Sequence, residues 1–506
     1  MNVPLTTADF CHRARAVHAA RLAVVDEPGV PGGLGELTYG ELLARCDGMV
    51  SALDELGVAP GERVAIVSPN AAKLLIALYA TTGSGRILVP VNFRLTAAEA
   101  QYIVDDAGVS LLLVDPELDE RFASVTAPRR IVLDGEQDAA LFAPAAAPRE
   151  WPAVAEEAPA TINYTSGTTA APKGVVLSHR SHWLNAATVG WGFGLTEGDR
   201  YLHTLPTFHV NGWGLPLACA ALGVPQAIQR EVRGPEILRR VAAHGITLLC
   251  GAAPVAATIE QAAAALRDAG AAVPGDGVAR MVSGGAPTPA AIIEQFERTT
   301  GWEMIQAYGL TETAPVLTTN RILRSEGLSP SERARRLAAA GAPLVGVQLR
   351  ADEHGEILAR TAKTMDGYWN KPELYRQAVR ADGWFHTGDG GTLEDGVLRI
   401  TDRKKDVIVT GGENVSSLEV EAVLYQHPDV VDAAIIGVPH ERWGETPKAV
   451  VVLRDGVSLD EQQLIDHCRE HLAGFKCPTL FEQRRELPRT ATGKVQKFLL
   501  RETGAR

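Results

Sequence analysis

The chain has 506 residues, of which 46% are hydrophobic, and its formal net charge at pH 7 is −12. This length predicts more than one domain with large apolar cores, and the acidic balance argues against a nucleic-acid-binding surface. No apolar run approaches the roughly 18 residues of a membrane span, and the six cysteines lack CxxC spacing, so we expect buried, reduced thiols in a cytoplasmic protein without a zinc or disulfide framework.

The first part of the chain alternates helices and strands. Thr38 and Glu41 form a capping-box pattern ahead of an amphipathic helix to about residue 56, and Thr96 with Glu99 repeats this pattern farther on. The other expected elements are a strand at 63–68, a helix at 71–82, a strand at 87–91 and a strand at 110–115. This order is typical of an α/β protein with a largely parallel sheet.

Residues 164–174 form a small, donor-rich loop, Tyr-Thr-Ser-Gly-Thr-Thr-Ala-Ala-Pro-Lys-Gly. Its backbone amides and hydroxyls could close around phosphate oxygens. The spacing after Gly167 is not that of a Walker A loop, and a bare run of this kind is also typical of a flexible polar linker. The strand-like segments at 160–164 and 174–177 favour a hairpin that holds the loop in place.

The rest of the chain falls into four stretches of different character. We expect a renewed α/β pattern at 201–321, an exposed charged helix or loop at 322–340, short strands of a β patch at 341–401, and a boundary at 402–406. Beyond the boundary, strands at 430–438 and 449–453 and helices near 416–426 and 459–471 predict a compact α+β unit.

Three isolated side chains have a possible chemical role and a plain structural alternative. Glu312 follows an apolar strand and could bind Mg²⁺, which prefers oxygen ligands shared with nucleotide phosphates, or could be a solvated loop residue. Asp389 follows a tight glycine turn in Phe385-His-Thr-Gly-Asp389 and could accept ribose hydroxyls, or belong to an ordinary turn. Lys494 follows Gly493 in a loop that could project its amine into a site, or it could be an ordinary surface lysine.

Taken together and in order, these segments resemble the adenylate-forming superfamily of acyl-CoA synthetases, luciferases and peptide-synthetase adenylation domains. The motifs are the loop at 164–174, Tyr308-Gly-Leu-Thr-Glu-Thr313, Thr387-Gly-Asp389, Asp402-Arg-Lys-Lys-Asp406 and Thr492-Gly-Lys494. The similarity extends over nearly the whole chain, with residues 1–160 poorest in motifs. It implies a large N-terminal domain of residues 1–404 with mainly parallel sheets and a β patch, and a small, mobile α+β lid of residues 405–506 with its hinge near Lys405.

The resemblance implies a reaction in two steps. ATP and Mg²⁺ first convert a carboxylic acid to an acyl-adenylate and pyrophosphate, and the thiol of coenzyme A then displaces AMP. Both steps depend on stabilising developing negative charge. The expected partners are small molecules, and the oligomeric state stays open, with a homodimer as one alternative.

The resemblance also assigns residues to each part of the nucleotide. It implies that the pyrophosphate end of ATP is bound by Thr165, Ser166, Gly167, Thr168, Thr169, Ala170 and Lys173. The adenine would be bound by Gly284, Gly285, Ala286, Tyr308 and Gly309, and the ribose by Asp389 and Arg403. Thr311 and Glu312 would face the α-phosphate and Mg²⁺, and Lys494 would bridge the substrate carboxylate and the α-phosphate. Lid rotation at Lys405 would bring Gly411 and Gly412 to the coenzyme A side.

Residues 208–213, Phe-His-Val-Asn-Gly-Trp, are similar to a segment of fatty-acyl and related carboxylate–CoA ligases. The similarity implies that His209 lines the carboxylate end of the acid and that Trp213 gates the acyl tunnel; the alternatives are a core histidine and plain core packing. The small residues Gly212, Gly251 and Ala253 favour room for a medium to large hydrophobic acid, or reflect the alanine-rich composition.

One position departs from the usual loop, because Ala170 stands where the family has glycine. A residue with a side chain in the left-handed region costs about 1–2 kcal/mol, and the loss of one aligned donor costs about 10²–10³ in rate. Either a small loop shift tolerates the alanine, or the protein is a half-enzyme that thioesterifies a pre-formed acyl-adenylate. Acyl transfer to a carrier-protein thiol and a non-catalytic adenylate-binding protein are further alternatives. The retained Glu312, Asp389, Arg403 and Lys494 argue against the last.

Overall fold

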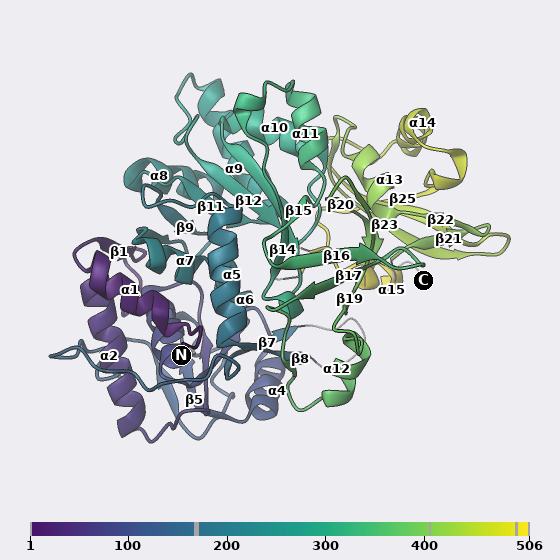
Figure 1. Ribbon diagram of the computed structural model, residues 1–506. Coiled ribbons are helices and arrows are strands. Elements are labelled where there is room, and N and C mark those ends of the chain that lie inside the picture. Colours follow the sequence, from purple (N-terminus) through teal and green to yellow (C-terminus); the bar gives the residue numbers. More distant parts are fainter. Residues whose placement is uncertain (1–2, 166–171, 404–405, 491–493, 504–506) are drawn as a thin grey trace.

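The structure is a computed structural model that describes residues 3–165, 172–403, 406–490 and 494–503. Within these residues the strands form four sheets, of which three precede residue 404 and the fourth follows it. Figure 1 shows the first three as one large body and the fourth as a smaller unit at the C-terminal side. The predicted class, α/β with a large N-terminal and a small C-terminal part, is confirmed.

The first large sheet contains the strands that flank the donor-rich loop. In spatial order its strands are β18 (Gly367–Tyr368), β8 (Lys173–Ser178), β7 (Pro159–Thr165), β4 (Ile87–Val91), β3 (Arg63–Val67), β5 (Val109–Val114) and β6 (Arg130–Val132). From β7 to β6 the pairs are parallel, whereas β7, β8 and β18 pair antiparallel. The central strands are apolar along their whole length because helices cover both faces of the sheet.

The second large sheet lies beside the first and is also mainly parallel in its centre. Its order is β15 (Ala342–Pro343), β14 (Val316–Asn320), β13 (Glu303–Gly309), β12 (Arg280–Gly284), β11 (Leu248–Gly251), β9 (Tyr201–His203), β10 (Gln226–Ile228), β1 (Leu22–Val25) and β2 (Glu36–Thr38). The strands β11, β12 and β13 end on the same edge of the sheet, which brings three of the sequence motifs together there.

The helices of the large body are α1 (Ala8–His18), α2 (Tyr39–Glu55), α3 (Ala72–Gly83), α4 (Ala97–Ala107), α5 (His179–Gly192), α6 (Val210–Trp213), α7 (Leu215–Leu222), α8 (Gly234–His244), α9 (Ala253–Asp268), α10 (Ala290–Thr300), α11 (Pro330–Leu337) and α12 (Pro372–Ala378). The helices predicted after Thr38, at 71–82 and after Thr96 are confirmed as α2, α3 and α4. Thr38 and Thr96 form complete capping boxes with Glu41 and Glu99, as predicted. Helix α5 packs against β7 and β8 of the first sheet and β14 of the second, so it lies between the two sheets (Figure 1).

The predicted β patch is a third sheet, with the order β16 (Val347–Ala351), β17 (Glu356–Thr361), β19 (Phe385–Glu394) and β20 (Val397–Arg403). Asp389 is part of the long strand β19 and does not follow a separate turn, although Gly388 before it has a φ of +72°. The charged segment 322–340 is not simply exposed. Its helix α11 buries Arg333, Ala334 and Leu337 because Arg333 forms an ion pair with Glu297.

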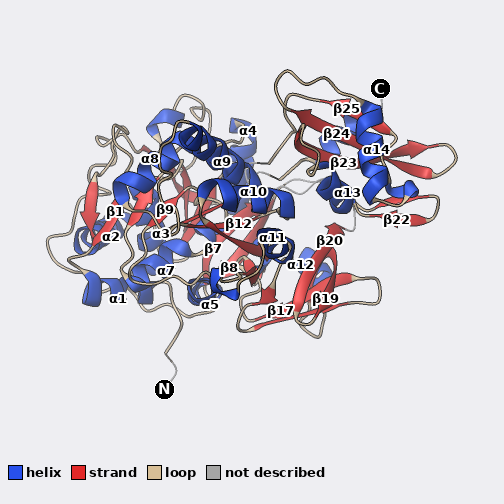
Figure 2. Ribbon diagram, turned by 90° about the horizontal axis from the view of Figure 1, so that it is seen from above, coloured by secondary structure: helices blue, strands red, loops and turns tan. Residues whose placement is uncertain are grey.

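The smaller unit has its own sheet and core, and Figure 2 shows it beside the large body. The sheet order is β22 (Glu413–Val415), β21 (Ile408–Thr410), β24 (Gly444–Leu453) and β23 (Val430–His440), and β25 (Leu480–Gln483) pairs with β24. Its helices are α13 (Ser417–Leu424), α14 (Glu461–His471) and α15 (Lys497–Thr503). The strands and helices predicted after residue 406 are thus confirmed. All six cysteines of the chain are buried, free thiols, as predicted.

Candidate functional site

The two ends of the donor-rich loop face each other across a hairpin. Thr165 at the end of β7 and Lys173 at the start of β8 are register partners, so the predicted strand–loop–strand hairpin is confirmed. Five of the predicted phosphate-binding residues lie outside the described part of the chain, as does Lys405 of the predicted hinge: Ser166, Gly167, Thr168, Thr169 and Ala170.

Lys173 and Glu312 come together through a tyrosine that the sequence analysis missed. The Tyr368 hydroxyl donates to Oε1 of Glu312 at 3.0 Å, and the Lys173 amine lies 5.4 Å from the centre of the Tyr368 ring. Burial, and then the neighbouring Glu312, raise the pKa of Tyr368, so its hydroxyl keeps its proton and remains a donor. Strand β18 places Tyr368 beside β8, and the only sequence signal is the aromatic pair at 368–369.

A second cluster joins Tyr308, Asp389 and Arg403. The Tyr308 hydroxyl donates to Oδ2 of Asp389 at 2.8 Å, and Nε of Arg403 lies 3.5 Å from Oδ1 of the same carboxylate. Asp389 and Arg403 are register partners on β19 and β20. Burial, and then Asp389, raise the pKa of Tyr308 well above its ordinary value. These contacts hold a carboxylate and a guanidinium side by side at the end of β13, where a nucleotide ribose would find both.

The residues predicted to bind adenine and those predicted to bind the acyl group are in contact at Gly284. A Cβ on Gly284 would lie 2.5 Å from Cη2 of Trp213 and 2.9 Å from the carbonyl oxygen of Ala307. Glycine is therefore required for Trp213 to pack on the edge of β12. Gly285 follows with a φ of +89°, and Ala286 is exposed beyond it. The structure thus brings Gly284, Tyr308 and Trp213 to one edge of the second sheet.

His209 and Trp213 are carried by an unusual backbone turn. From Val210 to Gly214 every residue has a positive φ, with 36°, 49° and 56° at Val210, Asn211 and Trp213. The segment labelled α6 is therefore a left-handed turn. Such a conformation costs roughly 1–2 kcal/mol for each residue with a Cβ, so it persists only where the surroundings fix it. Gly212, with a φ of +61°, serves this turn.

The small residues of the predicted acyl wall do not all leave open space. A Cβ on Gly251 would lie 2.8 Å from the Val255 side chain, so at this position the expected gain of room is wrong and Val255 fills the space. Ala253 is the first residue of α9 and is partly exposed. Gly251 and Ala253 lie at the end of β11 and the start of α9, and their place in an acyl wall stays a prediction.

Lys494 of the smaller unit lies near His209 of the large body. Burial, and then the positive charge of Lys494, lower the pKa of His209 to about 3, so its imidazole is neutral at physiological pH. The backbone around Lys494 is held by Thr490, whose hydroxyl accepts from the Lys494 amide at 3.1 Å and whose amide donates to the Lys494 carbonyl oxygen at 2.7 Å. The positive charge of the C-terminal motif therefore lies close enough to His209 to act on it electrostatically.

Gly411 and Gly412 lie apart from these residues. They form the two-residue connection between β21 and β22, with φ values of +59° and +88°, which a type I′ hairpin requires. Both views place this hairpin on the outer side of the smaller unit (Figures 1 and 2). The exposed Trp443 packs against Gly411 and accepts its amide proton at 2.8 Å through the backbone oxygen; the sequence analysis missed it.

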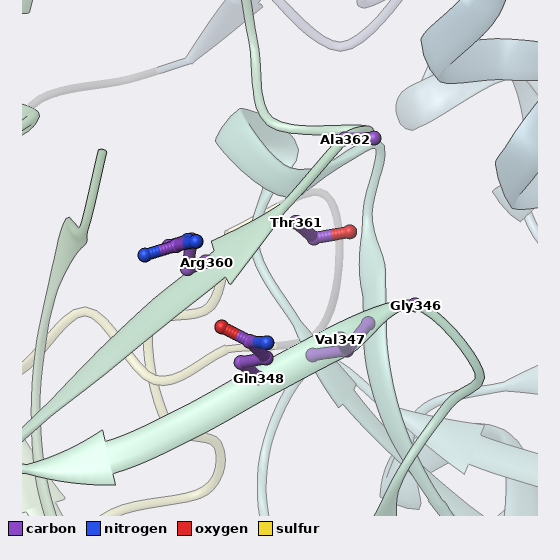
Figure 3. A pocket seen from close by; sticks show the side chains of 6 residues that line it. All are labelled: Gly346, Val347, Gln348, Arg360, Thr361 and Ala362. Carbon is purple, nitrogen blue, oxygen red and sulfur yellow. The ribbon is translucent and has the colours of Figure 1, made fainter. Parts of the chain in front are cut away.

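A surface pocket of about 520 Å³ lies at the start of β16 and the end of β17 (Figure 3). It is lined by Gly346, Val347, Gln348, Arg360, Thr361 and Ala362. None of these is a predicted site residue.

Among the described residues, no helix is long and apolar enough to cross a membrane, and no group of three or more His, Cys, Asp or Glu is placed to hold a metal ion.

Family models match both parts of the chain. The model described as AMP-binding enzyme matches residues 11–369, and that of the AMP-binding enzyme C-terminal domain matches residues 419–494. The chain belongs to the AMP-binding enzyme family. The resemblance to adenylate-forming enzymes is thereby confirmed.

Individual relatives of this AMP-binding enzyme are similar along nearly their whole length. The 2-methylpropanoate–CoA ligase CCL4 of Humulus lupulus is 32% identical over 541 residues, which cover 99% of this chain and 95% of that protein. The peroxisomal benzoate–CoA ligase of Arabidopsis thaliana is 32% identical, with 99% and 93% covered. The crystal structure of the anthranilate CoA ligase AuaEII in complex with anthranoyl-AMP has a TM-score of 0.87 at 27% identity, with 99% and 98% covered.

These findings make the protein an acyl-CoA ligase of the AMP-forming class, and the alternative of a non-catalytic adenylate-binding protein is set aside. Some relatives carry a peroxisomal location in their names, so the cytoplasmic location stays a prediction, as does a homodimer.

Proposed function

We propose that this ligase converts a medium to large hydrophobic carboxylic acid to its coenzyme A thioester through an acyl-adenylate, with ATP and Mg²⁺. The observation that carries the proposal is the approach of Lys494 to His209, beside Trp213 and the edge of β12. This arrangement supplies a compact positive charge where an acid carboxylate and the α-phosphate of ATP would meet. His209 is neutral there, so Lys494 is the cation of the pair.

In the first step, an oxygen of the acid carboxylate bonds to the α-phosphorus of ATP, and the bond from that phosphorus to the pyrophosphate oxygen breaks. In the second step, the sulfur of coenzyme A bonds to the acyl carbon, the carbon–oxygen bond to AMP breaks, and the thiol proton passes to solvent. We assign Tyr308, Asp389 and Arg403 to the nucleoside, and Thr165 and Lys173, with the loop between them, to the phosphates. Thr311 faces the α-phosphate.

Glu312 fits a magnesium ion shared with ATP. Mg²⁺ is commonly bound by one or two protein carboxylates together with substrate phosphates. Tyr368 donates to Oε1 of Glu312, which orients the carboxylate, and Glu312 would then hold the ion. When bound, the ion would neutralise phosphate charge, and Lys173 over the Tyr368 ring would add to this.

We further propose that residues 1–404 and 405–506 are the two domains, with a hinge near Lys405 that turns the lid between the steps. In the second orientation Gly411 and Gly412 would approach coenzyme A, and the exposed Trp443 beside them would offer an aromatic surface. The names of the relatives, which specify a branched four-carbon acid and an aromatic acid, support a hydrophobic acid as the substrate.

The decisive experiment is a panel of linear, branched and aromatic acids. Each is supplied as free acid with ATP and Mg²⁺, and as pre-formed acyl-adenylate, and acyl-CoA is measured by mass spectrometry. We expect thioester from both forms of at least one hydrophobic acid, with pyrophosphate released only from the free acid. No thioester from any acid in either form would contradict the proposal. A carrier protein added to the same assay shows whether its thiol competes with coenzyme A.

The second candidate is a half-enzyme that uses only pre-formed acyl-adenylates, which the alanine at position 170 favours. If this is correct, wild type releases pyrophosphate slowly and Ala170→Gly raises that rate by about 10²-fold, while thioester formation from the adenylate is the same in both. Equally rapid pyrophosphate release by wild type and variant would remove this candidate.

A further inference from the structure

A lysine amine lies inside the large body, close to the turn that carries His209 and Trp213. Lys363 follows Ala362, the last residue of the pocket in Figure 3, and its side chain is 1% exposed. Its Nζ donates to Oδ1 of Asn185 and Oγ1 of Thr188 at 3.4 Å each, and to the backbone oxygen of Val316. Within the described part of the chain no carboxylate forms an ion pair with it.

Such an amine is costly to bury, because neutral oxygens replace water only in part. Burial lowers the pKa of Lys363 to about 7. A methionine of similar length would fill the same space without this cost. The contacts of the amine, and not its packing, therefore explain why a lysine stands here. The three groups that it contacts belong to α5 and β14, the elements between the acyl and nucleotide regions.

The amine fixes the orientation of one amide side chain. Because the Lys363 amine donates to the oxygen of the Asn185 amide, the nitrogen of that amide faces away from it. That nitrogen donates to the backbone oxygen of Trp213 at 3.0 Å. A Cβ on the next residue, Gly214, would lie 2.6 Å from the same nitrogen. Asn185 thus fits directly against the backbone of the left-handed turn.

The turn needs such an external contact. Its own backbone bonds join Gly212 to the His209 oxygen and Gly214 to the Asn211 oxygen, and these do not tie it to the rest of the fold. Val210, Asn211 and Trp213 hold positive φ values that residues with a Cβ rarely adopt. Asn185 connects the turn to α5, and Lys363 connects α5 to β14.

We propose that Lys363 is a positioning residue for the acyl site: through the Asn185 amide it holds the Trp213 carbonyl, and with it the turn that presents His209 and Trp213 to the acid. The inference rests on the proposed function for the identity of the substrate. It assigns to Lys363 an effect on acid binding, and none on ATP binding.

The first test compares wild type with Lys363→Met, and uses Lys448→Met as a matched control, because Lys448 pairs with Glu482 on the smaller unit. We expect the KM for the acid to rise about tenfold in Lys363→Met, as for the loss of one buried hydrogen bond, with an unchanged KM for ATP. The Tm is measured on the same variant, because the loss of a buried amine and the acceptors left without a donor change stability in opposite directions. A lower Tm with equal losses for acid and ATP would indicate a merely structural lysine.

The second test asks whether Lys363 acts through Asn185. If it does, the double variant Lys363→Met with Asn185→Leu has the same acid KM as Asn185→Leu alone. Multiplied losses in the double variant would overturn the proposal. Asn185→Asp is a further test variant. Its carboxylate pairs with the Lys363 charge but cannot donate to the Trp213 carbonyl oxygen, so we expect this variant to keep its Tm and to lose affinity for the acid.

A measurement without substrate separates this inference from the proposed function. Amide hydrogen exchange of the segment 205–217 should be faster in Lys363→Met than in wild type, while exchange in β3 and β4 stays the same. If wild type forms no thioester, the proposed function fails, and the exchange data still decide the role of Lys363. If wild type is active but neither the acid KM nor the exchange changes, only the role of Lys363 is wrong.

Discussion

Lys494 and His209 are the residues on which the choice between the two half-reactions depends. The imidazole is kept neutral by burial and by the lysine charge, so the carboxylate of the acid meets one cation at this point. An ammonium is a compact, strongly hydrated charge. In the proposed function, Lys494 therefore acts in the step in which charge accumulates on the α-phosphate.

The first prediction concerns Lys494→Met. We expect pyrophosphate release from free acid and ATP to fall by about 10²–10³, because the charge that faces the developing phosphate charge is lost. Thioester formation from a pre-formed adenylate should change less than about threefold, since the α-phosphate is already esterified. Both rates are measured on the same protein preparation. Equal losses in the two assays would show that Lys494 does not act in adenylation alone.

The second prediction concerns Tyr308→Phe, which removes one hydroxyl and leaves the ring. Asp389 then loses the bond that holds Oδ2 at 2.8 Å, and its orientation toward the ribose is less defined. We expect the KM for ATP to rise about three- to tenfold, with an unchanged KM for the acid, in steady-state assays. A change in the acid KM of the same size would mean that Tyr308 serves the acyl side.

At the scale of elements, the edge of β12 joins the two halves of the site. Gly284 ends this strand and Trp213 packs on it, so a small change in the strand moves the acyl side and the nucleotide side together. Left-handed turns of this kind are fixed by the elements around them. The site therefore depends on the fit between β12, α5 and the turn, more than on any one of them.

The third prediction tests this fit with Gly284→Ala. The added Cβ would lie 2.5 Å from Trp213 and must displace the ring or the strand. We expect the free energy of unfolding to fall by roughly 1–3 kcal/mol and the acid KM to rise at least tenfold. Gly190→Ala is the control, because nothing lies within 4 Å of its Cβ in α5, and alanine there should stabilise the helix slightly. Normal acid kinetics of Gly284→Ala would contradict the described packing.

Elements with local signals were predictable from the sequence. The capping boxes at Thr38 and Thr96 and the apolar runs of β3, β4 and β5 gave bounds within one or two residues, because caps and burial act over a few neighbouring positions. The left-handed turn and the contact of Tyr368 with Glu312 were not predictable, since they depend on residues 28 and 56 positions apart in the chain. Gly251 was misjudged because its space is filled by a side chain from the following helix.

At the scale of the whole molecule, several buried histidines make stability depend on pH. Burial lowers the pKa of His179 and His203 to about 4 and that of His182 to about 3. In the unfolded chain these groups have an ordinary pKa of about 6.5. Between these values the unfolded state binds more protons, so the free energy of unfolding falls as pH falls from 6.5 toward 4.

The fourth prediction follows from this sign. Between pH 7.5 and 5.5 each of the three histidines should lower the free energy of unfolding by roughly 1 kcal/mol, measured by urea titration at both values. His182→Gln should reduce that difference by its own share of roughly 1 kcal/mol, because glutamine does not titrate. Stability that is equal at the two pH values would mean that these imidazoles reach water or a carboxylate in the folded protein.

The last prediction concerns how the smaller unit is held over the large body. Oδ2 of Asp402, at the end of β20, accepts from the amide and the hydroxyl of Ser417 at 2.6 Å each, and Arg501 forms an ion pair with Asp406 at 2.9 Å. The Asp402–Ser417 bonds join the two sides of the proposed hinge, whereas the Arg501–Asp406 pair lies within the smaller unit. Loss of the Asp402 carboxylate therefore removes contacts that belong to this orientation of the two units, and it shifts the population of molecules away from this orientation.

We expect Asp402→Ala to slow pyrophosphate release about tenfold, while thioester formation from a pre-formed adenylate is unchanged or faster. Ser417→Ala keeps the backbone bond, so its effect on pyrophosphate release should be smaller. If both half-reactions slow equally, or if Tm falls enough to unfold the variant at the assay temperature, these bonds stabilise the fold and do not select an orientation.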